Sequence, residues 1–378
     1  MAILTTDQED LRKLVAAFAQ KEIAPKAAYY DRTEEFPREN LSKMAELGLL
    51  GLPIPEQYGG AAVDTVSYVA AIEEISKACA STGAIMAVHI SAGIMPIYLF
   101  GSPEQQQKYI PDLAGGQKIG AFALTEPGAG SDASRVMTTA EEAGDSYVLN
   151  GSKCFITNGG QADTYSIFAT VDKSKGVKGI TGFIVEAGTP GFTIGKKEEK
   201  MGIRASSTTE LIFQDCRIPK ENLLGKVGEG FKIAMVVLDG ARIGIGAQAV
   251  GIAQAAYEEA LHYAKVREQF GKPIAAQQAV SFMLADMAIQ IEAARHLVYH
   301  AAALKDAGRA YGKEAAMAKT FASDIAVKVA LDAIQIMGGY GYSREYPVER
   351  LLRDAKITQI YEGTNQIQRV VIAGHILK

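Results

Sequence analysis

Residues 147–157 read YVLNGSKCFIT, and helical periodicity gives way to an extended pattern here. Two apolar runs flank Asn150 and Gly151, which both tolerate positive φ. This pattern predicts two strands joined by a hairpin turn at Asn150-Gly151. Further strands are predicted at residues 165–171, 179–186 and 209–213. The middle of the chain, from about residue 120 to 225, is therefore predicted to be a β domain.

Helical patterns precede this region. Residues 6–9, Thr-Asp-Gln-Glu, match a capping box, and the apolar residues that follow recur at helical spacing. The glycine pairs at 59–60 and 115–116 separate further helical segments, without an alternating strand pattern. The first 115 residues are predicted to be helical.

Helical periodicity returns after Gly230. Breaks at residues 271–273, 307–308 and 338–339 predict three long helices followed by a shorter pair. Three glycines of the first long helix, Gly244, Gly246 and Gly251, resemble a dinucleotide fingerprint only in part. Because no strand precedes them, we interpret them as sites of close helix packing. The predicted order is helices, then strands, then a helical bundle.

Composition excludes several classes of protein. The 378 residues carry 43 acidic and 39 basic side chains mixed along the chain, a net charge of −4, so no nucleic-acid partner is expected. The three cysteines are far apart, which suits a reducing compartment and buried free thiols. The start of the chain lacks a secretory pattern, and the apolar stretch at 93–100 is too short to span a bilayer. We expect a soluble, cytoplasmic protein without membrane insertion.

Metal and hydrolase sites are not indicated. His296 and His300 are one helical turn apart but have no acidic residue in a metal-binding pattern, so no metal is expected. The chain also has no phosphate-loop motif and no GxSxG motif.

Three stretches could carry chemistry. Residues 122–134, FALTEPGAGSDAS, could present backbone N–H groups to an electron-rich ligand, although an ordinary turn has the same composition. Residues 335–354, QIMGGYGYSREYPVERLLRD, allow close backbone approach at the glycine pair, although a helix C-cap would also explain Gly338. Residues 361–366, YEGTNQ, place Glu362 where partial burial would raise its pKa toward that of a general base. The alternative is a surface glutamate with Thr364 as a helix N-cap.

Taken together, residues 123–132 and 335–354 resemble the two signature stretches of the acyl-CoA dehydrogenase family. Residues 155–160, 201–213, 267–274 and 353–369 are also similar to this family, so the resemblance covers essentially the whole chain. It is strongest to bacterial butyryl-CoA dehydrogenases. It implies an α+β multidomain fold: an N-terminal helical domain (1–119), a central β-barrel-like domain (120–226) and a C-terminal four-helix bundle (227–378).

The resemblance also implies a homotetramer that binds FAD between the β domain and the bundle. The residues expected to contact FAD in their own subunit are Phe122, Leu124, Thr125, Ser131, Phe155, Ile156, Thr157, Thr364 and Gln366. Those expected to reach the adenosine-diphosphate part from a neighbouring subunit are Arg267, Phe270, Gln278, Gln335, Gly338 and Gly339. Many relatives have tryptophan where this chain has Phe155, which is also flat and apolar.

By the same resemblance, Ser131, Asp239, Arg242, Tyr361 and Gly363 line the acyl-CoA path, and Glu362 removes the α-proton. A hydride then passes to flavin N5 and trans-2-enoyl-CoA is formed. Some relatives carry the base at the position of Ala241, which cannot accept a proton. Glu362 therefore favours an unbranched short or medium acyl chain.

Alternative functions remain open at this stage. The same residues could work physiologically in reverse, as an enoyl-CoA or acryloyl-CoA reductase. A non-catalytic flavin-binding scaffold is a second alternative, although the intact Glu362 argues against it. An acyl-CoA oxidase would be expected to have a further C-terminal domain. The resemblance implies an electron-transfer flavoprotein as the partner that reoxidises the enzyme.

Overall fold

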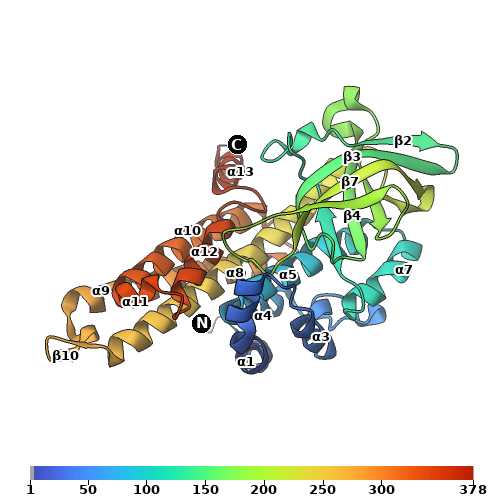
Figure 1. Ribbon diagram of the computed structural model, residues 1–378. Coiled ribbons are helices and arrows are strands. Elements are labelled where there is room, and N and C mark those ends of the chain that lie inside the picture. Colours follow the sequence, from blue (N-terminus) through green and yellow to red (C-terminus); the bar gives the residue numbers. More distant parts are fainter. Residues whose placement is uncertain (1–3, 378) are drawn as a thin grey trace.

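The computed structural model describes residues 4–377, which form helices, then a β-sheet, then a helical bundle along the chain (Figure 1). In Figure 1 the sheet lies at one end of the long helices of the bundle, and the N-terminal helices lie below both. The order confirms the predicted α+β architecture, with an N-terminal helical part, a middle β part and a C-terminal helical part.

The N-terminal helices are α1 (Thr6–Phe18), α2 (Ala27–Thr33), α3 (Arg38–Glu46), α4 (Thr65–Ala78), α5 (Ala80–Val88), α6 (Met95–Phe100) and α7 (Pro103–Ala114). The capping box of α1 lies one residue earlier than predicted. Thr5 is the N-cap: its backbone N–H donates to Gln8 Oε1 (2.9 Å), and its hydroxyl accepts from the Gln8 N–H. Gln8 also donates to Asp64 Oδ2 (2.7 Å), and Asp64 is the N-cap residue of α4. The start of α1 is therefore tied to the start of α4.

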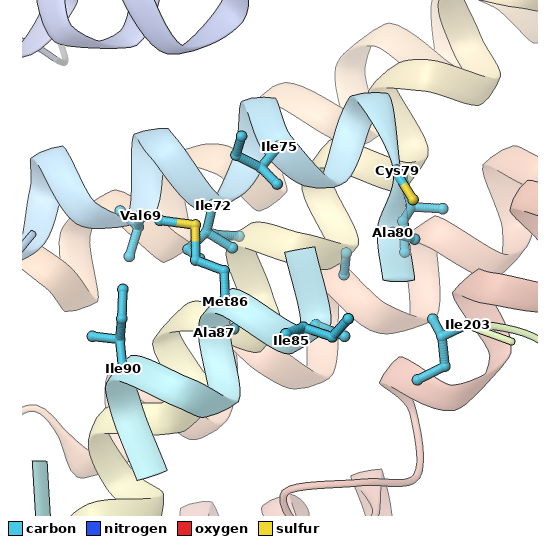
Figure 2. Packing of buried hydrophobic residues seen from close by; sticks show 14 of the residues in the cluster. Val69, Ile72, Ile75, Cys79, Ala80, Ile85, Met86, Ala87, Ile90 and Ile203 are labelled. Carbon is cyan, nitrogen blue, oxygen red and sulfur yellow. The ribbon is translucent and has the colours of Figure 1, made fainter. Parts of the chain in front are cut away.

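Residues 80–100 form a longer apolar helical run than the sequence indicated. A π-helical turn, His89–Ile94, joins α5 to α6, and the combined segment has the length and composition of a membrane span. Within its most apolar 18 residues, 72% are buried inside the protein, which is the behaviour of a core helix. Figure 2 shows why: Met86 of α5 lies against Val69 and Ile72 of α4.

The β part is one eight-stranded sheet in the order β6-β7-β3-β2-β4-β5-β8, with β1 paired to β4. The strands are β1 (Gly120–Ala123), β2 (Thr139–Ala143), β3 (Ser146–Thr157), β4 (Thr164–Thr170), β5 (Ile180–Glu186), β6 (Phe192–Lys197), β7 (Thr208–Pro219) and β8 (Leu223–Leu224). The predicted strands at 165–171, 179–186 and 209–213 correspond to β4, β5 and β7. The sequence did not reveal β2 and β6, whose alternation is interrupted by charged residues.

The hairpin turn predicted at Asn150-Gly151 is wrong. Both residues lie inside β3, and the turn is at Gly144 (φ 67°), between β2 and β3. The two apolar runs pair with the same strand, β7, and the register shifts between Leu149 and Gly151. A side chain at Gly151 would lie 2.7 Å from the Thr138 hydroxyl, so the glycine permits a bulge in a continuous strand.

A buried ion pair holds the end of β1 against β3. The fully buried Lys153 ammonium donates to Glu126 (2.7 Å) and to the carbonyl oxygens of Leu124 (3.2 Å) and Phe168 (2.5 Å). Burial lowers the pKa of Lys153 to about 8. Burial also acts to raise the pKa of Glu126, but attraction to Lys153 holds that pKa below its ordinary value. The pair therefore fixes residues 124–126.

Replacing Lys153 with methionine is expected to lower the free energy of unfolding by about 3–5 kcal/mol, because Glu126 is left buried without its cation. Chemical denaturation of the two proteins measures the difference. Lys220→Met is the matched control: it breaks an exposed pair with Glu142, for which a loss below about 1 kcal/mol is expected. Equal losses in the two variants would contradict the stabilising role of the buried pair.

The C-terminal helices are α8 (Gly230–Val266), α9 (Gln278–Asp306), α10 (Gly312–Met337), α11 (Gly339–Tyr342), α12 (Val348–Thr358) and α13 (Asn365–Ile376). The breaks predicted between the three long helices are confirmed, and a short hairpin of β9 (Glu268–Gln269) and β10 (Lys272–Pro273) joins α8 to α9. The glycines of α8 do serve close packing. A side chain at Gly251 would lie 2.3 Å from the Glu73 carbonyl, and one at Gly246 would lie 2.9 Å from Val298.

Candidate active site

Glu362 lies in the loop between α12 and α13 with a left-handed backbone (φ 55°). A non-glycine residue in this region costs about 1–3 kcal/mol and persists only where its surroundings hold it. Gln368 supplies part of that support, because its amide donates to the carbonyl oxygens of Glu362 (3.0 Å) and Gly363 (2.9 Å). The loop is thus held in one conformation by side chains of the bundle.

The Glu362 carboxylate points into the protein. Its Oε2 atom is buried and has no hydrogen-bond partner among residues 4–377. Burial raises the pKa of Glu362 to about 7, and the nearby positive charges of Arg242 and Lys319 only partly oppose this. Thr364 is the N-cap of α13, because its hydroxyl accepts from the Ile367 N–H (3.3 Å). The alternative prediction, a surface glutamate followed by a Thr364 helix cap, is therefore correct for Thr364. Glu362 itself, however, is only partly exposed, and its Oε2 atom is buried.

Three buried, unpartnered polar atoms belong to Glu362 and to two side chains, Arg242 and Gln368, that act on it or on its loop. Arg242 of α8 is 4% exposed and donates through Nη1 to Asp239 Oδ1 (2.5 Å), but its Nε has no partner within the described chain. The Oε1 atom of Gln368 is also buried and unpartnered, like Glu362 Oε2. Buried polar atoms in proteins nearly always have partners. A group of unpartnered ones is what a polar ligand would complete.

Aromatic side chains close the site on the α4 and α5 side. The Tyr361 hydroxyl donates to the Gln248 side-chain oxygen, and Gln248 donates to a backbone carbonyl of α5 (3.0 Å). Burial raises the pKa of Tyr361 and of Tyr68, and the charge of Glu362 raises each further. A side chain at Gly244 would lie 3.2 Å from the Tyr68 hydroxyl, so this glycine makes room for the ring. Both tyrosines therefore stay protonated beside Glu362.

Phe155 presents an apolar surface from the β part. It sits at a bulge of β3, with a left-handed φ of 56°, and its side chain is 64% exposed. Leu124 and Ile156, predicted to contact the same ligand, have buried side chains, so only their backbone is available there. Phe122 is half-buried and packs on Phe168. The left-handed backbone at Phe155 therefore presents an exposed aromatic ring.

The glycine-rich loop after β1 is open. Thr125 accepts a hydrogen bond from the Cys154 N–H (3.0 Å), which ties the start of the loop to the strand that carries Phe155. Side chains at Gly128 and Gly130 would meet nothing within 4 Å, and neither glycine has a left-handed φ. A sharp turn therefore does not require these glycines. Because they have no side chains, the backbone of the loop is exposed to solvent at these glycines, next to the exposed Ser131.

A groove of about 630 Å³ lies at the other end of the bundle and includes Arg267, Gly338 and Gly339. The Arg267 guanidinium lies over the Tyr340 ring (5.6 Å), and Phe270, at the turn of the β9–β10 hairpin, is 93% exposed. Gln278 and Gln335 are exposed there too. Figure 1 shows this end of α9 and α11 far from the β-sheet. The predicted cofactor residues thus form separate groups within one chain.

A second hollow, of about 460 Å³, lies beside the Glu362 loop. Thr364 and Gln366 line it from the start of α13, where Thr364 is the N-cap, and Asp324 and Lys356 line it from α10 and α12. The structure therefore places Arg242, which pairs with Asp239, near the Glu362 carboxylate, whereas Thr364 and Gln366 line this separate hollow.

Some residues of this site were missed in the sequence. Lys319, Gln248 and Gln368 are fully buried polar side chains that contact the Glu362 loop or Tyr361. The available signal was a charged or amide residue within an apolar helical face, as in AAMAKTFA at residues 315–322. Among residues 4–377, no three His, Cys, Asp or Glu side chains are grouped so that they could hold a metal ion.

Comparison with known proteins adds the family. Models described as the N-terminal, middle and C-terminal domains of acyl-CoA dehydrogenase match residues 5–117, 121–216 and 228–377. The chain is 60% identical to "Acyl-CoA dehydrogenase" of Bacillus subtilis, with 99% of both chains covered. It is 54% identical to "Acyl-CoA dehydrogenase, short-chain specific" of Clostridium acetobutylicum, again covering 99% of both. It is also 53% identical to "Acryloyl-CoA reductase (NADH)" of Anaerotignum propionicum, covering 99% of this chain and 95% of that one.

Solved structures agree with this result. Butyryl-CoA dehydrogenase from Megasphaera elsdenii superposes with a TM-score of 0.98 at 52% identity, covering 99% of both chains. A chain in the structure named for the electron transferring flavoprotein of Acidaminococcus fermentans superposes with a TM-score of 0.98 at 55% identity and the same coverage.

Proposed function

Because this chain is an oxidoreductase that belongs to the acyl-CoA dehydrogenase family, we propose that it dehydrogenates short-chain acyl-CoA thioesters to trans-2-enoyl-CoA. The observation that carries the proposal is the buried, unpartnered carboxylate oxygen of Glu362. The names of the short-chain and butyryl-CoA relatives support the choice of substrate.

Glu362 is the proposed catalytic base. An α-hydrogen next to a thioester is weakly acidic, so its removal needs a carboxylate positioned close to it and donors near the carbonyl oxygen. A base works best when its pKa lies near the operating pH, and burial raises the pKa of Glu362 to about 7. The Glu362 N–H has no acceptor among residues 4–377 and would donate to the thioester oxygen as negative charge develops.

Further residues would position the substrate. The buried Arg242 lies near Glu362 and pairs with the partly exposed Asp239, and the free Nε of Arg242 can donate to a polar ligand. Ala241, at the position where some relatives carry the base, is buried and cannot take a proton. We propose that Ser131, Tyr361 and Gly363 complete the acyl-CoA path.

FAD is the proposed cofactor, and the residues present fit it. Phe155 offers an exposed flat face, and the open loop at 126–131 leaves room beside it. Thr364 and Gln366 line the hollow next to Glu362, while Arg267, Phe270, Gln278, Gln335, Gly338 and Gly339 lie around the distal groove. When bound, FAD supplies the acceptor for the hydride that leaves the β-carbon. Because the distal group is remote, we propose that it serves FAD bound in a neighbouring subunit of a homotetramer.

The direct test is anaerobic reduction of the purified, flavin-loaded protein by a series of saturated acyl-CoA thioesters. Butyryl-CoA should bleach the yellow colour fastest, and long chains should bleach it slowly. Bleaching only by branched or long chains would contradict the short-chain assignment. A protein that stays yellow with every thioester would instead be the non-catalytic scaffold.

The pH dependence of the reaction follows from Glu362. Only the deprotonated carboxylate can act as a base, so kcat/KM for butyryl-CoA should reach its full value well above pH 7 and fall as the pH drops through about 7. Well below that value the fall should approach about tenfold per pH unit. Initial rates from pH 5.5 to 8.5, with flavin content checked at each pH, measure this profile. A flat profile across this range would argue against a base with this pKa.

A second candidate function is the reverse reaction, which the 53% identity to an acryloyl-CoA reductase favours. The same residues would then return a proton to the α-carbon. Redox titration of the bound flavin with and without acyl-CoA and enoyl-CoA tests which direction is favoured. We further propose an electron-transfer flavoprotein as the redox partner and a cytoplasmic location.

A further inference from the structure

Lys319 of α10 is a fully buried lysine that reaches the Glu362 loop. Its ammonium donates to the Gly363 carbonyl (2.9 Å) and to Asn365 Oδ1 (2.9 Å). Asn365 in turn donates to Ser323 (2.8 Å) and Asp324 (2.7 Å). The carbonyl that Lys319 holds belongs to the residue directly after Glu362, so the contact acts on the left-handed turn itself.

A structural role alone does not account for a cation at this position. The neighbouring positions one turn before and after Lys319 on α10 are mostly small and apolar: Ala315, Ala316 and Ala322 are fully buried, and Ser323 is the buried polar exception. Burying an ammonium costs several kcal/mol, and apolar side chains of similar volume often replace buried charges without loss of stability. Burial lowers the pKa of Lys319 to about 7, and the charge of Glu362 opposes that shift. The cation therefore depends on the carboxylate beside it.

We propose that Lys319 is a positioning residue for Glu362, which holds the loop through the Gly363 carbonyl and keeps a positive charge beside the carboxylate. The inference rests on the proposed function, because it assigns Lys319 a part in the proton transfer by Glu362. Lys319 contacts the loop and not the reacting atoms, so it acts through Glu362.

The charged and titratable groups around the pair define the expected direction. Arg242 of α8 and Lys319 of α10 both favour the deprotonated carboxylate, and Asp324 favours the charged form of Lys319. Tyr68 of α4 and Tyr361 of the loop stay neutral and add no charge. Removing the Lys319 cation therefore leaves only Arg242 to oppose the effect of burial, and the pKa of Glu362 rises.

The test compares pH profiles of kcat and kcat/KM in flavin-loaded wild-type protein, Lys319→Met and Lys319→Gln. The acid limb is the part of the kcat/KM profile in which the rate falls at low pH. Lys319→Met removes both the donor and the charge. We expect kcat to fall by about ten- to a hundredfold and the acid limb to move up by about one pH unit. Lys319→Gln keeps a hydrogen-bond donor without charge, so it should recover part of kcat but retain the displaced acid limb.

Lys328→Met is the matched control, because Lys328 lies on the same helix in an exposed pair with Asp332. It should leave both kcat and the acid limb unchanged. Flavin content and melting temperature are measured for every variant, so that loss of fold is seen directly. If Lys319→Met does not fold, the proposal is tested by Lys319→Gln alone, from the position of its acid limb relative to that of the wild-type protein.

Two results would overturn the proposal. One is an unchanged kcat with an unchanged acid limb. The other is a reduced kcat with the wild-type acid limb, which would leave Lys319 a merely structural role. Failure of the proposed function looks different, because the wild-type protein itself would then not be bleached by any acyl-CoA.

Discussion

Glu362→Gln is expected to abolish turnover while the protein still binds FAD and butyryl-CoA. Glutamine has nearly the shape of glutamate but cannot take a proton, and its amide stays neutral at every working pH. The loss should be at least about 10³-fold, the upper part of the range for a positioned general base. Because Glu362 Oε2 has no partner in the described chain, the substitution breaks no side-chain hydrogen bond of that atom. The fold should therefore persist.

Rapid mixing under anaerobic conditions measures the effect as the rate of flavin bleaching in a single turnover. Binding of butyryl-CoA is followed separately, by the change in the flavin spectrum or by calorimetry. Glu46→Gln, at an exposed position at the end of α3, is the matched control and should bleach at the wild-type rate. A Glu362→Gln protein that bleaches within tenfold of wild type would remove Glu362 from the proposed role.

Arg267→Ala is expected to release FAD. Arg267 lies in the distal groove with Gly338 and Gly339, and its guanidinium is proposed to contact the phosphates of FAD bound in a neighbouring subunit. A hydrogen bond between charged groups contributes about 1.5–3 kcal/mol, so affinity should fall by roughly ten- to a hundredfold. Loss of the contact over Tyr340 adds to this only slightly.

The ratio of flavin to protein after gel filtration measures the effect, and light scattering shows whether the assembly persists. Arg309→Ala, at an exposed position in the turn between α9 and α10, is the control and should keep its flavin. Full flavin occupancy in Arg267→Ala, with the assembly intact, would show that this groove does not serve the cofactor. Loss of flavin together with dissociation would indicate that Arg267 acts at the subunit interface instead.

The order of helices, strands and bundle could be predicted because each depends on local periodicity. A helix or a strand needs an apolar face at a fixed spacing, and that spacing is visible in the sequence. The strands β2 and β6 escaped prediction because charged residues interrupt their alternation. Tertiary pairing with β3 and β7 forms them nevertheless.

The Asn150-Gly151 pair shows where local chemistry is ambiguous. The dipeptide tolerates the backbone of a turn and equally that of a bulge, and the sequence cannot tell which partner strand is present. Pairing of both flanking runs with β7 selected the bulge. The glycine-rich loop does form a tight turn, because Glu126 and Ala129 exchange backbone hydrogen bonds (3.0 and 3.2 Å), but Gly128 within it does not need a left-handed φ.

The residue types of the site were determined by the sequence alone. Glu362, with Gly363 after it and a helix cap at Thr364, and the absence of a carboxylate at Ala241, were evident from the motif and its resemblance to a family. What only the tertiary structure decided is the environment of that carboxylate. The Oε2 atom is buried and unpartnered, and the charges that approach it belong to Arg242 and Lys319, which lie 120 and 43 positions earlier in the chain. A pKa depends on solvent and on charges nearby in space, and neither is encoded in the spacing of residues along one segment.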